Sequence, residues 1–131
     1  MTQQSLLRPA LLVDAVASGA AGLLLVLAAD LLTGWLGFPV PVLRGAGLLL
    51  LPFAAFVGWL GRRGGDPLPA VRAVVALNAA WVLASFAVLV GPWFAPTALG
   101  IAFVALQAVL VGGFAVAQGH AAGLLRRPQA A

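Results

Sequence analysis

Four long apolar stretches constrain the fold of this sequence more than any other feature. They run over residues 10–33, 42–60, 70–90 and 97–117. An α-helix needs about 20 mostly apolar residues to cross the hydrocarbon core of a bilayer, and each stretch comes close to that length or exceeds it. Backbone polar groups in lipid must be satisfied within the protein, and stretches this long and uniformly apolar do not suit a barrel. They therefore predict four membrane-spanning helices.

The composition excludes most soluble classes of protein. Hydrophobic residues make up 63% of the 131 residues and charged residues only 8%, whereas soluble domains carry roughly 25% charged residues. A water-soluble domain of this length could not bury so much apolar surface in one core. A soluble enzyme, a disordered tail and a nucleic-acid-binding domain are therefore all poor interpretations, and no nucleic acid is expected as a partner.

The short connections between the stretches predict how the helices are arranged. Helices joined by such short connections form hairpins, so sequential neighbours are expected to pack antiparallel. The predicted fold is all-α: a polytopic membrane protein with a four-transmembrane-helix antiparallel bundle, built from two tandem hairpins. The whole chain, residues 1–131, forms a single transmembrane domain in this interpretation.

Arginines predict the orientation of the bundle in the membrane. Most of them flank the spans on one side, at Arg8, Arg62, Arg63, Arg126 and Arg127. The positive-inside rule then places both termini and the middle connection in the cytoplasm of a multi-pass protein of the bacterial inner membrane. At that face the arginines are expected to contact anionic lipid headgroups.

Aromatic residues near the span ends are typical of a membrane-interface belt. Trp59 precedes the double arginine of the second connection, on the predicted cytoplasmic side. The first and third connections are expected to face outward, and they supply the aromatic residues of the other interface: Trp35, Phe38, Trp93 and Phe94.

Several polar residues interrupt the apolar stretches, and each needs a partner or a purpose in lipid. Helical spacing predicts three stripes that face the bundle interior: Asp14 and Ser18, then Asn78, Trp81 and Ser85, then Gln107 and Gln118. Arg72 is expected at a depth similar to that of Asp14, so the predicted polar interior comprises Asp14, Ser18, Arg72, Asn78 and Gln107. In a functional interpretation they line a polar pocket, with Asp14 as a proton-linked acid. In a structural interpretation the hydroxyl and amide groups join helices by hydrogen bonds, and Asp14 pairs with Arg72.

A second charged pair is predicted near the first connection. Asp30 lies towards the end of the first stretch and Arg44 near the start of the second, so the two side chains reach a similar depth. We expect them to form an outer ion pair that holds the first hairpin together. An anion site at Arg44 is the alternative.

Residue sets that carry catalysis or bind metals are missing from the sequence. It contains no cysteine and one histidine, which excludes disulfides and thiolate ligands. No phosphate-binding glycine loop, catalytic triad or paired carboxylates can be found. We therefore predict no catalytic residues, no cofactor and no metal, and the chain is not expected to be an enzyme.

In hydropathy and length, residues 11–125 resemble the many small four-span bacterial inner-membrane proteins. Small multidrug transporters have a similar size, but their mechanism needs a glutamate in the first span and this chain has no glutamate. The leading hypothesis is a non-enzymatic helical bundle, acting as an accessory or scaffold subunit or as a homo-oligomer. Its partners would be another membrane protein or further copies of itself. The alternative is a small oligomeric transporter or channel whose polar path is lined by Asp14, Ser18, Asn78 and Gln107.

Overall fold

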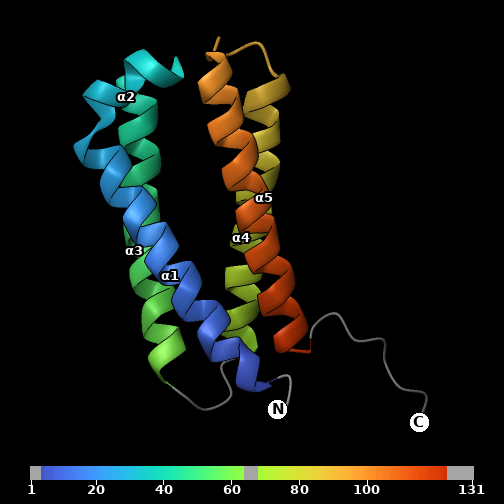
Figure 1. Cartoon of the computed structure of the whole chain (residues 1–131). Helices are drawn as coiled ribbons and strands as arrows, with labels where there is room; N and C mark the ends of the chain where they lie inside the picture. Colours follow the sequence, from blue (N-terminus) through green and yellow to red (C-terminus); the bar gives the residue numbers. More distant parts are fainter. Residues whose placement is uncertain (1–3, 64–67, 124–131) are drawn as a thin grey trace.

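The structure, a computed structural model, describes residues 4–63 and 68–123 (Figure 1). Within these ranges all regular structure is helical: α1 (Gln4–Leu27), α2 (Ala29–Leu36), α3 (Val40–Arg63), α4 (Leu68–Val90) and α5 (Ala98–Ala121). Four of the helices are long and α2 is short. The predicted all-α fold with a four-helix bundle is confirmed. Arg126 and Arg127 lie outside the described residues.

The predicted first span, 10–33, is divided into two helices. α1 starts earlier than expected, and its 24 residues extend about 36 Å, enough to cross a hydrocarbon core of about 30 Å. The helix breaks at Ala28, where φ is −108° and ψ is 16°, and α2 follows at the end of the bundle (Figure 1). The apolar residues continue through the break, so hydropathy alone does not reveal it.

The long helices form two hairpins that are joined unevenly. α1 lies along α3, α4 lies along α5, and the two pairs meet mainly through α1 and α5 (Figure 1). α3 and α4 do not pack along their lengths, so the expectation that all sequential neighbours pack is wrong for this pair. The reason is that α3 directs its closest contacts at α1.

Glycines allow α1 and α3 to approach closely. A Cβ atom built on Gly47 would lie 2.7 Å from the carbonyl oxygen of Gly22, so only glycine fits at this crossing. Below it, a Cβ on Gly58 would meet the Cβ of Ala15 at 3.4 Å. Small residues at helix crossings are the usual means of tight packing between membrane helices, where van der Waals contact drives association.

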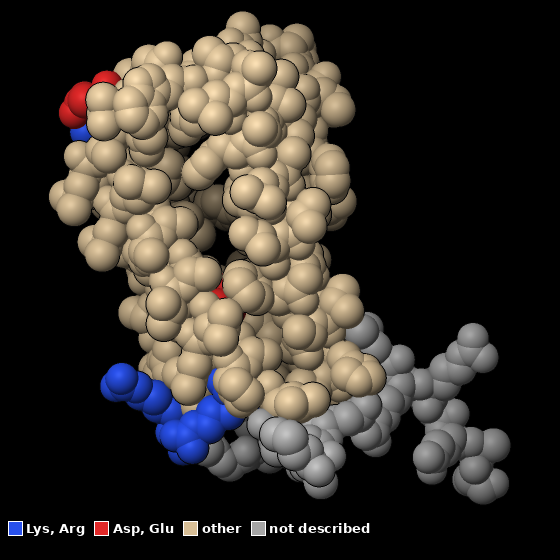
Figure 2. Space-filling model, in the orientation of Figure 1, with Lys and Arg blue, Asp and Glu red and all other residues tan. Residues whose placement is uncertain are grey.

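The two ends of the bundle are closed by apolar side chains. We call one the arginine-rich end, because Arg8, Arg62, Arg63 and Arg72 lie on the helix segments there; Figure 2 shows basic side chains gathered at that end. Next to it, one buried cluster joins α1, α3 and α4: Leu11, Val57, Leu60, Val71 and Val74. We call the opposite end the α2 end. A second buried cluster lies there: Leu25, Ala29, Leu32, Leu36, Phe38 and Leu43.

Thr97 joins the two hairpins at the α2 end. Its hydroxyl caps α5 by accepting a hydrogen bond from the Gly100 N–H at 3.1 Å, and donates to the carbonyl oxygen of Trp35 at 2.6 Å. Its own N–H donates to the carbonyl oxygen of Leu36 at 3.0 Å. The last carbonyls of α2, which have no partner within their own helix, are thus satisfied by the start of α5. Gly37, in the left-handed region with φ of 81°, ends α2 beside this contact.

The outer surface of the bundle is apolar over most of its length. Four helical segments are long and apolar enough to cross a membrane: Leu6–Leu27, Val40–Arg63, Leu68–Val90 and Ala98–Ala121. Large apolar side chains such as Val16, Leu83 and Val109 are exposed on them. The chain therefore fits a multi-pass integral membrane protein.

The aromatic residues expected at the membrane interfaces divide into two groups. Trp35 and Trp93 at the α2 end are mostly exposed, and so is Trp59 near the arginine-rich end. Phe38 is buried instead, in edge-to-face contact with Phe94 at 5.8 Å between ring centres. The predicted belt position is wrong for Phe38, because the turn after α2 directs its ring into the core between the hairpins.

Candidate functional site

A buried group of polar side chains lies where α1, α4 and α5 meet. The carboxyl group of Asp14 accepts hydrogen bonds from the Ser18 hydroxyl at 2.9 Å, the Asn78 amide at 3.0 Å and the Gln118 amide at 2.6 Å. The Asn78 amide also donates to the side-chain oxygen of Gln118 at 3.0 Å. We call these four residues the Asp14 cluster. Asp14 and Gln118 are 0% exposed.

Helical periodicity explains how the Asp14 cluster forms. Asp14 and Ser18 are four residues apart, so both lie on one face of α1. That face is turned to α5, which supplies Gln118, while α4 packs on α5 and supplies Asn78. A buried polar group without a partner is costly in lipid, and here every member has at least one partner from within the cluster.

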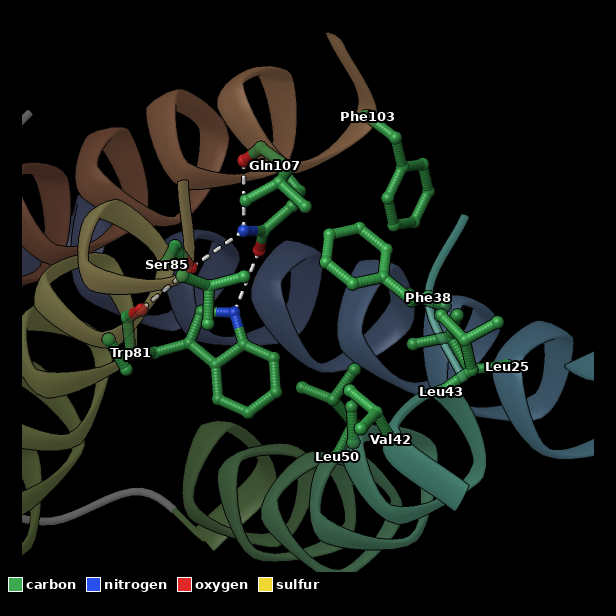
Figure 3. A pocket seen from close by; sticks show the side chains of 14 residues that line it. Leu25, Phe38, Val42, Leu43, Leu50, Trp81, Ser85, Phe103 and Gln107 are labelled. Atoms are coloured by element: carbon green, nitrogen blue, oxygen red, sulfur yellow. Dashed lines mark hydrogen bonds between the residues drawn. The ribbon is translucent and has the colours of Figure 1, made fainter. Parts of the chain in front are cut away.

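A second polar group lies further from the arginine-rich end, between α4 and α5. The indole N–H of Trp81 donates to the side-chain oxygen of Gln107 at 2.7 Å, and the Gln107 amide donates to the Ser85 hydroxyl at 2.8 Å. Ser85 in turn donates to the backbone oxygen of Trp81 (Figure 3). We call these three residues the Gln107 cluster. The Gln107 amide also donates to the backbone oxygen of Val104, so both of its amide hydrogens are used.

Two cavities lie between the hairpins, and Figure 2 shows the hollow between the halves. The smaller, of about 200 Å³, is lined by all four long helices and by Phe38 (Figure 3). The larger, of about 400 Å³, lies chiefly between α3 and α4. Trp81 and Leu50 line both cavities. The lining is mainly apolar, and the polar side chains that reach it are Ser18, Asn78, Ser85 and Gln107.

The structure brings together only part of the predicted polar interior. Asp14, Ser18 and Asn78 join one cluster, whereas Gln107 belongs to the other. The Asp14–Arg72 ion pair that the sequence suggested is not formed, and Arg72 is exposed. The reason is geometric: Arg72 precedes Asn78 by six residues, a turn of about 240° around α4, so it cannot share the inward face.

Three residues of the clusters, Gln118, Trp81 and Ser85, lie outside the predicted polar interior, although their helical spacing puts them on stripes that are expected to face inward. Gln118 occupies the position expected for Arg72 as a partner of Asp14, and Trp81 is the partner of Gln107. A signal for Gln118 exists in the sequence, because it lies eleven residues after Gln107 and so on nearly the same stripe of the helix. The apolar stretch 97–117 stops one residue before Gln118, whereas α5 continues to Ala121.

The structure places the predicted outer pair together at the α2 end. A guanidinium nitrogen of Arg44 lies 3.0 Å from a carboxylate oxygen of Asp30, and the Arg44 Nε also donates to the backbone oxygen of Val26. Asp30 lies in the first turn of α2, where a negative charge is favourable. The contact thus joins α2 to α3 across the break in the first hairpin. With side chains 81% and 41% exposed, however, it contributes little stability.

Reversing both charges of this pair tests its contribution. We expect Asp30→Arg and Arg44→Asp each to lower the free energy of unfolding by up to about 1 kcal/mol, because each places like charges side by side. The double substitution restores the attraction and is expected to recover part of that loss. Thermal unfolding in detergent measures all four proteins. A double variant no more stable than the single variants would show that the pair does not hold the hairpin.

No grouping of three or more His, Cys, Asp or Glu side chains occurs within the described ranges. A scan against protein-family models and searches of curated proteins and of solved structures return no match to this chain. The functional interpretation therefore depends on the polar clusters, the cavities and the apolar exterior.

Proposed function

We propose that this chain is a non-enzymatic integral membrane protein that acts through helix packing, as an accessory or scaffold subunit or as a homo-oligomer. One observation carries the proposal: the polar side chains within the spans bond mainly to one another in two closed clusters, while the cavities beside them are lined mainly by apolar side chains. Groups used in this way hold helices together, as interhelical hydrogen bonds do in other membrane bundles.

The proposed setting is the bacterial inner membrane, with the arginine-rich end in the cytoplasm. Support for this orientation comes from the distribution of charge. Arg8, Arg62, Arg63 and Arg72 lie near one end, and the α2 end carries the Asp30–Arg44 pair, whose charges cancel. Positive charge is retained on the cytoplasmic side during membrane insertion. Other membrane proteins or further copies of this chain would contact the apolar exterior, and anionic lipid headgroups would contact the arginines.

A small transporter or channel is the second candidate, and the Asp14 cluster is the observation that favours it. A carboxyl group fully buried between three membrane helices is the kind of group that marks proton and ion pathways. Gln107 lies about 16 Å from Gln118, nearer the start of α5, and belongs to a separate cluster, which argues against a continuous polar path.

Proton flux in liposomes separates the two candidates. For a packing protein we expect purified wild type to give the same proton leak as protein-free liposomes, and Asp14→Asn to give the same leak again. Asp30→Asn is the matched control, because its carboxyl group is exposed at the α2 end. A wild-type flux above the protein-free level that Asp14→Asn abolishes and Asp30→Asn retains would overturn the packing role in favour of transport.

A further inference from the structure

The larger cavity opens on the side of the bundle where α3 and α4 do not pack along their lengths. Its wall on α3 includes Leu49, Phe53 and Phe56, and its wall on α4 includes Leu77 and Trp81. Three of these side chains also reach the outer surface, with Leu49 66%, Leu77 53% and Phe56 38% exposed. The cavity therefore has a mouth formed by two helices that are each long enough to cross a membrane.

Hydrocarbon is the natural occupant of such a cavity. Apolar cavities of roughly 150 Å³ already stay dry and take up small apolar molecules, and this one measures about 400 Å³. In a bilayer, its mouth faces acyl chains at high local concentration. The hydroxyl of Ser18 and the amide of Asn78, which reach this cavity, both donate to the Asp14 carboxyl group, so no polar ligand is needed to satisfy them.

One face of α3 runs from the wall of this cavity to the guanidinium group of Arg63. Phe56, Trp59 and Arg63 follow one another at spacings of three and four residues, so they lie on a single stripe. The rings of Phe56 and Trp59 are 6.3 Å apart, and the Arg63 guanidinium lies 5.3 Å from the centre of the Trp59 ring. Seven residues place Arg63 about 10 Å along the helix from Phe56, within the 15 Å or so that one lipid leaflet's chains occupy.

We propose that the α3–α4 side of the bundle binds an anionic phospholipid, with its phosphate at Arg63 and one acyl chain in the larger cavity. A guanidinium stacked on an aromatic ring keeps its N–H groups directed outward in its plane, where they can bind phosphate oxygens. Arg63 at one end of the stripe thus contacts the headgroup, and Phe56 at the other end contacts the acyl chain. This site goes beyond the general contact between arginines and anionic headgroups, since it assigns one lipid to one arginine and places its acyl chain in the larger cavity.

Quenching of Trp81 fluorescence tests the site directly. The variant Trp35→Phe/Trp59→Phe/Trp93→Phe keeps Trp81 as the single tryptophan of the four in the chain, and phenylalanine at position 59 keeps an aromatic ring for Arg63 to stack on. It is reconstituted in phosphatidylcholine vesicles that contain increasing fractions of chain-brominated phosphatidylglycerol or chain-brominated phosphatidylcholine. One arginine near the surface contributes about a fivefold preference for anionic lipid, so we expect half-maximal quenching at about a fivefold lower fraction of phosphatidylglycerol.

Two pairs of matched variants, made in this background, locate the lipid. Arg63→Gln is expected to abolish the preference, while Arg62→Gln, one residue away on another face of α3, retains it. Leu77→Phe fills part of the cavity and is expected to weaken quenching by both lipids, whereas Leu83→Phe, exposed on α4 outside the cavity lining, leaves it unchanged. Equal quenching by the two lipids, equal losses in the two arginine variants, or no effect of Leu77→Phe would each overturn the proposal.

Discussion

Asn78→Leu is expected to lower the free energy of unfolding by about 3 kcal/mol, a large effect for one side chain of similar size. The Asn78 amide donates to both Asp14 and Gln118, at 3.0 Å in each case, and leucine can donate to neither. The Asp14 carboxyl group then stays buried with two donors in place of three. The side-chain oxygen of Gln118 loses its donor within the cluster. Unfolding in mixed micelles, driven by sodium dodecyl sulfate and followed by circular dichroism, measures the change.

Removing the three members of the Asp14 cluster that bond between helices, Asp14, Asn78 and Gln118, distinguishes lost hydrogen bonds from lost packing. Replacing both partners of a buried hydrogen bond by apolar groups is far less costly than replacing one of them. The triple variant Asp14→Leu/Asn78→Leu/Gln118→Leu is therefore expected to be more stable than the sum of its three single variants predicts. Ala79→Leu, on an exposed position of α4, controls for the added leucine. Additive effects of the three substitutions would mean that the cluster does not act as a unit.

The inward faces of the helices are the part of this site that the sequence reveals best. Polar residues are so rare in these spans that their spacing alone indicates which stripe faces the interior. Asp14 and Ser18, four residues apart, and Asn78 on α4 lie buried on such stripes. The helix rise also explains why Gln107 does not join them, because it lies about 16 Å along α5 from Gln118, the residue of that helix that bonds to Asp14.

Which polar residues pair with one another was harder to predict than which of them face inward. Opposite charges at similar depth suggest an ion pair between Asp14 and Arg72, yet the direction of Arg72 around α4 excludes the contact. Gln118 bonds to Asp14 instead, because α1 packs on α5. The sequence does not indicate which faces of the two hairpins pack against each other. Contacts within one helix follow from periodicity, whereas contacts between helices depend on how the hairpins dock.

The α2 end departs most from the sequence-based prediction for the same reason. Leucine and alanine continue across Ala28, so the break in the first span has no local signal such as proline or glycine. The break is instead accompanied by tertiary contacts: Leu32 and Leu36 of α2 are buried against the core, and Thr97 of the second hairpin bonds to the last carbonyls of α2. Residues more than sixty positions apart thus fix a feature that a hydropathy window cannot detect.

Gly100→Ala is expected to destabilise the protein by about 3 kcal/mol or more. A Cβ atom at this position would overlap the carbonyl oxygen of Leu36, which is part of the backbone and cannot rotate away. α5 must therefore move from α2, which weakens the two hydrogen bonds that Thr97 donates to Trp35 and Leu36. The ordinary preference of helices for alanine over glycine, about 1 kcal/mol, works in the opposite direction and is too small to compensate.

Two further variants of α5 and its cap separate this close approach from a general effect of alanine. Gly113→Ala lies on the same helix with no atom within 4 Å of the added Cβ, so we expect it to raise stability by about 0.5–1 kcal/mol. Thr97→Val keeps the shape but removes the hydroxyl group, and is expected to cost about 1–2 kcal/mol through the lost cap and the lost bond to Trp35. If Gly100→Ala were as stable as Gly113→Ala in the same micelles, the contact between α2 and α5 would not be what joins the two hairpins at this end.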